Sequence, residues 1–386
     1  MQARNVRRVH HPLHVEHWHD RPFLARASPT AVCLAGEARV IHMAKVRRLI
    51  DLHLRRPLNG DMFLVLSPKW SNREQVQLEE AGLPDSQKKW TLTGATMQAI
   101  ARELNPVTMA VAHDESMLKL LSQLELNHSE THAVHHCAML QPLPARIEAD
   151  SRETGGDGAA WHRSNFQTGA CSPQLSLALR FRACLGAIEL AERRRAGLQY
   201  TWVVRSRPDV KIPCALPFAA LTYTSARGAV AFADDYLAIM PRAAAEVSLR
   251  QVPLARELNA SACFFDIMHA LPERVARDED DFVYWHTMER CNPCIAELAG
   301  WAYAAATNMI WSESLREYDN APTAIPWREE EDGHAFNCSL KTTSHRPDDR
   351  ASSPPGMQPG SRLPWLSLEI REPEPERCYG KRREKL

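Results

Sequence analysis

A chain of 386 residues, 44% of them hydrophobic and 24% charged, has the composition of an ordinary globular protein and is long enough to bury a full core. Its 47 basic and 47 acidic residues balance, so no net charge draws the whole molecule to nucleic acid or to an anionic membrane. It contains no run of the roughly 18 apolar residues that a membrane span needs, and its first 30 residues have no apolar core like that of a signal peptide. The composition therefore predicts a globular protein with no nucleic-acid partner and no membrane span in this chain.

The first predicted elements are a flexible arm and a βαβ unit. Residues 1–29 carry several Arg and His residues and no apolar core, so we expect a poorly ordered arm. Ala31–Ala35 is an apolar run closed by Gly36, Val40–Leu54 has apolar side chains at helical spacing, and Met62–Leu66 is a second apolar run. A strand, a helix and a strand at this spacing predict a parallel pair of strands joined by a right-handed crossover.

A helix, a strand, a loop and the clearest helix of the chain are predicted next. Met97–Leu104 has helical spacing, and Val107–Ala112 favours a strand. Residues 143–172 are polar and rich in Gly, which indicates a loop or an insertion. In Gln174–Arg195 the apolar side chains fall on one stripe, and the arginines at its end suit the C-terminal end of a helix dipole.

Two further strands end in charged residues. Tyr200–Val204 is an aromatic and β-branched run that leads directly into Arg205–Asp209, with the sequence RSRPD. Gly228–Ala233 is another apolar run, and it ends at Asp234 and Asp235. We therefore expect charged side chains at the ends of both strands.

The rest of the chain predicts helices and then a tail. Helical segments are expected over about 270–320, and from residue 328 the chain is polar and rich in Pro. A segment of that composition buries too little apolar surface to fold alone. The predicted organisation is an arm over 1–29, an α/β domain over 30–327 and a disordered tail over 328–386.

Polar groups follow four of the predicted strands, in the segments Gly36–Arg39, Ser67–Lys69, Arg205–Asp209 and Asp234-Asp235. In open α/β sheets, ligands bind beyond the carboxyl ends of parallel strands. Arg side chains match phosphate oxygens, and Asp oxygens bind Mg²⁺ or Mn²⁺. These segments predict a site for a negatively charged ligand, with ordinary salt bridges and a solvated turn as the alternative interpretation.

Several segments resemble one family of proteins. AVCLAGEAR (31–39), GDMFLVL (60–66), YTWVVRSRPDV (200–210) and ADDYLAIMPRAAAE (233–246) are similar to GT-A-fold glycosyltransferase-like proteins of algae and protists. They are more distantly similar to glycosyltransferases of lipopolysaccharide and capsule synthesis. The resemblance covers roughly residues 30–320, and the segments RSRPD and ADDYLAIMPR carry most of it. It implies a GT-A-like, Rossmann-like α/β fold with a mostly parallel central sheet flanked by helices.

The resemblance implies that a nucleotide-diphosphate sugar is the donor and that it is held at the strand ends. Gly36 and Arg39 would lie near the nucleotide, and Arg205 and Arg207 would hold the diphosphate. The sugar would pass to a glycan, a lipid or a protein acceptor. Such transferases work in the Golgi or the secretory lumen, whereas the residues themselves carry no signal for it, so that location and the cytoplasm both stay open.

The resemblance also implies roles for three aspartates. Asp209 would bind Mn²⁺ or Mg²⁺, or the ribose, and Asp235 or Asp234 would face the acceptor hydroxyl, one of them as general base. Arg207 stands where the first acid of the D-x-D turn of the wider fold would be, and a guanidinium neutralises diphosphate charge itself. This departure motivates a second hypothesis, a non-catalytic nucleotide- or glycan-binding protein that keeps the fold.

Other motifs favour structural roles. Four histidines have helical spacing without a carboxylate partner, which indicates a surface or packing role rather than a metal site; they are His128, His132, His135 and His136. A lone Cys291-Asn292-Pro293-Cys294 favours a disulfide or two free thiols over zinc. The sequence has no phosphate-binding loop, no G-x-S-x-G and no G-x-G-x-x-G, so it does not support a P-loop ATPase, an α/β-hydrolase or a typical dinucleotide-binding protein.

Overall fold

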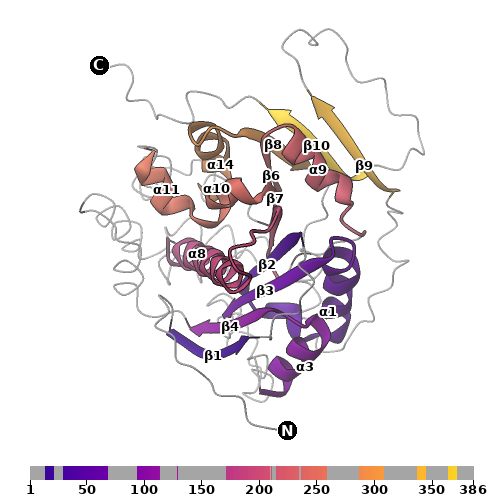
Figure 1. The fold of residues 1–386 in the computed structure, drawn as a ribbon, viewed down its shortest axis with the longest axis vertical. Helices are drawn as coiled ribbons and strands as arrows, with labels where there is room; N and C mark the ends of the chain where they lie inside the picture. Colours follow the sequence, from indigo (N-terminus) through magenta and orange to yellow (C-terminus); the bar gives the residue numbers. More distant parts are fainter. Residues whose placement is uncertain are drawn as a thin grey trace, which may run out of the picture.

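The computed structural model describes residues 14–20, 29–67, 94–113, 128, 171–208, 210, 214–233, 236–258, 287–307, 337–344 and 364–371. These residues form one sheet with helices on both faces (Figure 1). The strand order within the described residues is β1-β4-β3-β2-β5-β7-β6-β8-β10-β9. The strands are β1 (His14–Asp20), β2 (Thr30–Glu37), β3 (Gly60–Ser67), β4 (Thr108–His113), β5 (Trp202–Ser206), β6 (Ala229–Ala233), β7 (Leu237–Pro241), β8 (Ala302–Thr307), β9 (Asn337–Ser344) and β10 (Pro364–Arg371).

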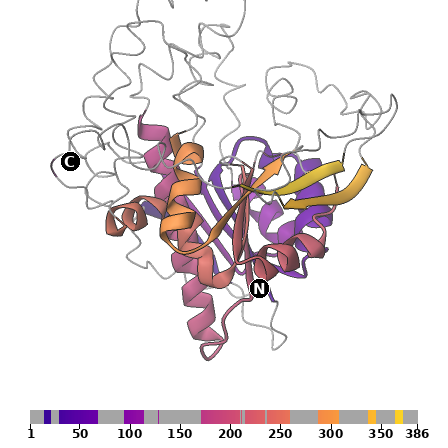
Figure 2. The same ribbon diagram turned by 90° about the horizontal axis from the view of Figure 1, so that it is seen from above.

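Helices cover both faces of this sheet because its central strands are apolar on both sides. Along β2, Ala31, Cys33 and Ala35 belong to one buried cluster, and Val32 and Leu34 belong to the other. The helical elements are η1 (Arg39–His42), α1 (Ala44–Ile50), η2 (Asp51–Arg55), α3 (Gly94–Leu104), α8 (Cys171–Arg194), α9 (Phe218–Ala226), η3 (Arg242–Ala244), α10 (Ala245–Leu249), α11 (Gln251–Glu257) and α14 (Thr287–Leu298). Figure 2 shows α8 and α14 on one side of the sheet and the purple helices α1 and α3 on the other. No helix in the described part of the chain has the length and apolar character of a membrane span.

The predicted βαβ unit is confirmed. β2 and β3 pair in parallel over their whole length, from Thr30 opposite Gly60 to Glu37 opposite Ser67, and η1, α1 and η2 connect them. The predicted elements around 97–104, 107–112, 174–195, 200–204 and 228–233 also correspond to α3, β4, α8, β5 and β6. The helix and strand periods in the sequence therefore locate most of the central domain.

The sheet is mixed, so the expectation of a mostly parallel sheet is wrong. The strands β4, β3, β2 and β5 run parallel to one another, but β7 is antiparallel to both of its neighbours, β5 and β6. Strands β1 and β10 are antiparallel to β4 and β8. The connection between β6 and β7 explains the central reversal, because residues 234–236 are too few for the crossover that a parallel pair requires.

The ends of the chain contribute strands, which corrects the expectation of a disordered arm over 1–29 and a disordered tail over 328–386. β1 pairs with β4, and β10 lies between β8 and β9. β1 joins the edge of the sheet through backbone hydrogen bonds, which need few apolar side chains. In β10 the apolar residues Leu366, Leu368 and Ile370 alternate with polar residues, and Leu368 is fully buried in the core. The other residues of the arm and the tail, and residues 143–170 of the expected loop, lie outside the described residues; Cys171 begins α8.

One strand lies where helices were expected. Within 270–320 the described residues form α14 and then β8, whose sequence is AYAAAT. Ala is the strongest helix former, so local preference favours a helix there. Parallel pairing of β8 with β6 outweighs that preference, and Ala304 and Ala305 pack into the sheet as small buried side chains.

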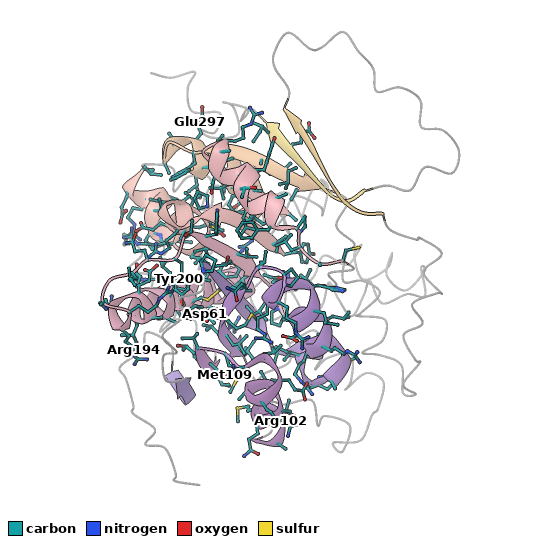
Figure 3. The ribbon with its side chains drawn as sticks, turned by 45° about the vertical axis from the view of Figure 1, so that its right-hand side comes forward. Asp61, Arg102, Met109, Arg194, Tyr200 and Glu297 are labelled. Carbon is teal, nitrogen blue, oxygen red and sulfur yellow. A yellow bond between two sulfur atoms is a disulfide. The ribbon has the colours of Figure 1, made fainter. Side chains whose placement is uncertain are left out.

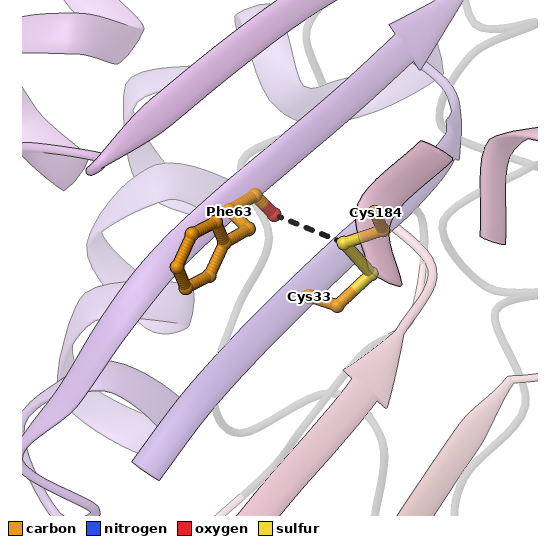
Figure 4. The surroundings of a disulfide bond; sticks show 3 residues. All are labelled: Cys33, Phe63 and Cys184. Carbon is orange, nitrogen blue, oxygen red and sulfur yellow. Dashed lines mark hydrogen bonds between the residues drawn. A yellow bond between two sulfur atoms is a disulfide. The ribbon is translucent and has the colours of Figure 1, made fainter. Parts of the chain in front are cut away.

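A disulfide joins the sheet to its longest described helix. Cys33 of β2 and Cys184 of α8 are both fully buried and are bonded to each other, with Cα atoms 6.2 Å apart (Figure 4). Cys184 Sγ lies 4.0 Å from the carbonyl oxygen of Phe63 in the adjacent strand β3. The bond therefore fixes α8 across β2 and β3, and it links positions 151 residues apart in the sequence.

A buried ion pair anchors the amino-terminal end of β5. Glu192 of α8 accepts hydrogen bonds from Arg242 Nε and Nη2, each at 2.8 Å, and from the backbone N–H of Tyr200 at 3.0 Å. Burial opposes the charge of Arg242, yet the hydrogen bonds and charge of Glu192, with attraction from Glu189 and Glu246, raise the pKa of the guanidinium above its ordinary value. The pair joins α8 to the residue that follows β7.

Tyr200 extends this anchor to β3. Its hydroxyl donates to Asp61 Oδ2 at 3.0 Å, and the two side chains lie together in Figure 3. Its ring packs edge-on against Phe63, and the Arg195 guanidinium lies 4.4 Å from the ring centroid. Burial, followed by the charge of Asp61, raises the pKa of Tyr200, so the phenol stays protonated as a donor over the ordinary pH range.

Candidate functional site at the carboxyl edge of the sheet

The strand order reverses beside β2, which marks one edge of the sheet as a candidate site. From β2 the chain moves to β3 and β4 on one side, and β5 then pairs with β2 on the other side. Because β2 and β5 are parallel, their carboxyl ends lie at the same edge, with Leu34 opposite Ser206. Such a switch point is where ligands bind in open α/β sheets.

The chain segments after β2 and β5 are in contact at this edge. A Cβ atom placed on Gly36 would lie 3.1 Å from Pro208 Cδ and 4.0 Å from Arg207 Cγ. The backbone of Gly36 has φ near +150°, a conformation that other residues rarely adopt. The N–H of Ala38 donates to the carbonyl of Ser67 at 3.0 Å, which brings the end of β3 to the same place. Glycine at position 36 therefore permits the close approach of the two segments.

Gly36→Ala is expected to lower the free energy of unfolding by about 2 kcal/mol, because alanine is strained at this φ and its methyl group would press on Pro208. Urea unfolding of the purified variant measures this change. Gly186→Ala on the exposed face of α8 is the matched control, since nothing lies within 4 Å of a Cβ placed there and alanine favours a helix. Equal stability of Gly36→Ala and the unchanged protein would contradict the role assigned to Gly36.

The segment between β6 and β7 also reaches the end of β5. The backbone N–H of Arg207 donates to the carbonyl of Tyr236 at 3.0 Å, and the Arg207 guanidinium carbon lies 4.9 Å from the centroid of the Tyr236 ring. The N–H of Tyr236 in turn donates to the carbonyl of Ala233 at 3.0 Å. Three segments from distant parts of the sequence thus meet around Arg207, which is half-buried, and Pro208, which is buried.

Arg205 lies inside the sheet rather than at its edge. Only 1% of its surface is exposed, and its guanidinium carbon lies 4.3 Å from the ring centroid of Phe181 in α8 and 6.0 Å from that of Phe232 in β6. Stacking on aromatic faces stabilises a guanidinium in such a setting. The two arginines of the segment RSRPD therefore differ: Arg205 packs under α8, and Arg207 is the one beside the strand ends.

Other residues that the sequence suggests for the site are outside the described part of the chain. They are Asp209, Asp234 and Asp235, and the same holds for the side chain of Arg39, whose backbone begins η1. Their neighbours in the sequence are described: Pro208 and Val210 are buried, and Ala233 and Tyr236 are hydrogen-bonded to each other. Of the suggested residues, the structure brings together Gly36 and Arg207.

The candidate metal ligands of the sequence either lie outside the described residues or belong to no metal-binding group within them. Within the described ranges, no group of three or more His, Cys, Asp and Glu side chains is arranged to hold a metal ion. Of the four clustered histidines only His128 is described, and it is exposed. Cys291 and Cys294 are buried in α14, and each is disulfide-bonded, so neither is a free thiol.

Tyr236 is a residue of the site that the sequence does not predict. Its position after two aspartates and at the start of an apolar run gives no indication that it lies beside Arg207. The contact depends on the antiparallel pairing of β5 with β7, in which Ser206 is opposite Leu237 and the next pair along is Arg207 and Tyr236. The short connection between β6 and β7 is the one indication that the sequence gives of this contact. Links of a few residues join antiparallel strands, so it predicts a hairpin.

Comparisons of this chain with models of protein families, with curated proteins and with solved structures found no match.

Proposed function

We propose that this protein is a glycosyltransferase, which transfers a sugar from a nucleotide-diphosphate sugar to a glycan, lipid or protein acceptor. The observation that supports the proposal is the meeting of Gly36, the pair Arg207 and Pro208, and Tyr236 at the switch point of the sheet. A guanidinium beside the carboxyl ends of these strands suits a ligand that carries phosphate groups.

A GT-A-like form of the α/β fold is part of this proposal, and it would have a mixed sheet in place of the expected mostly parallel one. From β4 to β8 the strand order is β4-β3-β2-β5-β7-β6-β8, and β7 alone runs against the others in that part. Since one fold hosts many functions, the proposal depends on the residues at the edge and not on this arrangement.

Arg207 is the group to which we assign the diphosphate of the donor. A guanidinium forms two parallel, charge-assisted hydrogen bonds to phosphate oxygens. During transfer the bond between the anomeric carbon and the diphosphate oxygen breaks, so negative charge grows on the leaving nucleoside diphosphate. A fixed cation beside that oxygen stabilises the charge as it develops. Arg207 would therefore lower the barrier to bond cleavage as well as bind the donor.

The acceptor side of the reaction is assigned to the aspartates between β6 and β7. Asp235 or Asp234 would accept the proton of the acceptor hydroxyl while its oxygen forms the new bond to the anomeric carbon. Both follow Ala233 directly and precede Tyr236, which lies beside Arg207. This proximity in the sequence supports the choice of one of these aspartates as the general base. Asp209 is the residue proposed for Mn²⁺ or Mg²⁺, an ion that would add positive charge at the diphosphate.

The disulfide supports one of the two locations left open by the sequence. Disulfides form and persist in oxidising compartments, and Cys33 and Cys184 are bonded in the core. We therefore propose that the protein works in the Golgi or the secretory lumen, as the resemblance implies. Microscopy of the tagged protein in its own cells tests this location, and a diffuse cytoplasmic signal would contradict it.

Arg207→Gln is expected to weaken the binding of UDP- or GDP-sugars about 10- to 100-fold, because it removes charge-assisted hydrogen bonds to the diphosphate. Calorimetric titration with a panel of such donors, with and without Mn²⁺, measures the affinity, and chromatography of the products measures transfer or donor hydrolysis. Arg227→Gln is the matched control, since Arg227 also lies over a tyrosine ring, that of Tyr223 at 5.8 Å, but at the amino-terminal end of β6. Equal donor affinity of both variants and the unchanged protein would refute the assignment.

The alternative function is nucleotide or glycan binding without transfer. It is favoured by the cationic Arg207 at a turn where a D-x-D motif would supply an acid. Tight donor binding without hydrolysis or transfer to any offered acceptor would distinguish this function from catalysis.

A further inference from the structure

Tyr236 contacts Arg207 in two independent ways. The backbone carbonyl of Tyr236 accepts the N–H of Arg207 at 3.0 Å, and the guanidinium carbon of Arg207 lies 4.9 Å from the centroid of the Tyr236 ring. The first contact fixes where the Arg207 backbone leaves β5. The second fixes where the end of its side chain lies.

The pairing of β5 with β7 makes this arrangement a continuation of the sheet. Val204 is opposite Ile239, Arg205 is opposite Ala238, and Ser206 is opposite Leu237, so the next pair in the same register is Arg207 and Tyr236. Directly opposite residues of an antiparallel pair place their side chains on the same face. Tyr236 lies in the turn just before β7, and backbone hydrogen bonds to Arg207 and Ala233 hold it beside the end of β5.

A ring beneath a guanidinium contacts its flat face, so the ring does not compete with a phosphate group for the N–H groups. The attraction to the ring uses the flat face of the cation, whereas its N–H groups lie in the plane of the guanidinium and point outward. A free arginine side chain loses considerable rotamer freedom when it binds. An arginine that is already ordered by a ring loses less, and it binds a phosphate group more tightly.

We infer that Tyr236 is a positioning residue, which orders Arg207 for the diphosphate of a phosphate-bearing ligand. This inference rests on the proposed function of the same site. It adds that the aromatic ring at position 236, rather than its hydroxyl group, determines how strongly Arg207 binds.

The test uses inorganic pyrophosphate and UDP as probes for the full-length protein, with calorimetric titration at fixed ionic strength. Tyr236→Leu is expected to weaken the binding of both probes about three- to tenfold, because it removes the ring and keeps a smaller apolar side chain. Tyr236→Phe keeps the ring and is expected to bind within about twofold of the unchanged protein. Tyr236→Met is a second ringless variant for use if the leucine variant does not fold, as judged by thermal unfolding.

A double-mutant cycle distinguishes positioning from a general structural role. In the background of Arg207→Gln, Tyr236→Leu is expected to cause no further loss of pyrophosphate affinity, because the ring acts only through the arginine. Tyr223→Leu, which removes the ring from under Arg227 at the opposite edge, is the matched control and is expected to leave the affinity unchanged. An equal loss in the Phe and Leu variants, or a further loss in the double variant, overturns the inference.

The same measurements separate this inference from the proposed function. If Arg207→Gln weakens binding and Tyr236→Leu does not, only the positioning role is wrong. If neither substitution changes the affinity, or if the unchanged protein binds neither probe at millimolar concentration, the assignment of the diphosphate to Arg207 fails, and the positioning role fails with it.

Discussion

The double substitution Cys33→Ala and Cys184→Ala is expected to lower the free energy of unfolding by about 4 kcal/mol. The bond joins residues 151 positions apart, so it restricts the unfolded chain strongly. The chain-entropy relation gives about 5 kcal/mol for a loop of this length, and native disulfides commonly contribute about 2–5 kcal/mol. Guanidinium unfolding followed by circular dichroism, under non-reducing conditions, measures the change.

The single variants provide the control for this prediction. Because one bond needs both sulfur atoms, Cys33→Ala and Cys184→Ala are each expected to lose nearly the whole effect, and the double variant is expected to lose little more. Alkylation of the unfolded, unreduced protein followed by mass spectrometry should leave both cysteines unlabelled. Small and additive effects of the two single substitutions would show that the two sulfurs are not bonded.

Glu192→Ala is the second large effect that we expect, a loss of about 3 kcal/mol in the free energy of unfolding. The Glu192 side chain is 6% exposed and the Arg242 side chain 14% exposed, so removal of the carboxylate leaves a largely buried cation without its main partner. The backbone N–H of Tyr200 also loses its acceptor, and an unpaired buried donor costs about 1–3 kcal/mol. Urea unfolding of the variant measures the loss.

An exposed ion pair of the same kind is the matched control. Glu257 accepts a hydrogen bond from Arg250 Nη1 at 2.9 Å, but its side chain is 51% exposed. Glu257→Ala is therefore expected to change the free energy of unfolding by less than about 1 kcal/mol. If the two variants are equally stable, the buried pair has no special role. A double variant with Glu192→Leu and Arg242→Leu should recover part of the loss, because no buried charge then remains unpaired.

The sequence predicts those elements whose signal is local. The alternating and helical periods identify β2, the helical connection and β3, and they identify α8 and β5 to within a few residues. The charged segment after β5 is also visible, because an apolar strand that ends in two arginines, a proline and an aspartate is unusual. Gly36 was found for a similar reason, as the residue that closes an apolar run.

What the sequence does not predict depends on contacts between distant segments. The direction of β7 follows from the length of its connection to β6, and the strand at Ala302–Thr307 follows from pairing with β6 against a local preference for helix. The roles of Arg205 and Arg207 look equal in the sequence, yet burial under α8 separates them. Ten scattered cysteines do not show which of them are bonded, so the sequence does not predict the disulfide between Cys33 and Cys184.

The short connection between β6 and β7 also constrains how the chain can change in length over evolution. Leu237 is opposite Ser206 on one side and opposite Ala233 on the other, so β7 is fixed in register by two neighbours at once. Loss or gain of one residue within β7 would turn its side chains to the opposite faces of the sheet. Related sequences are therefore expected to show no insertion or deletion within Leu237–Pro241.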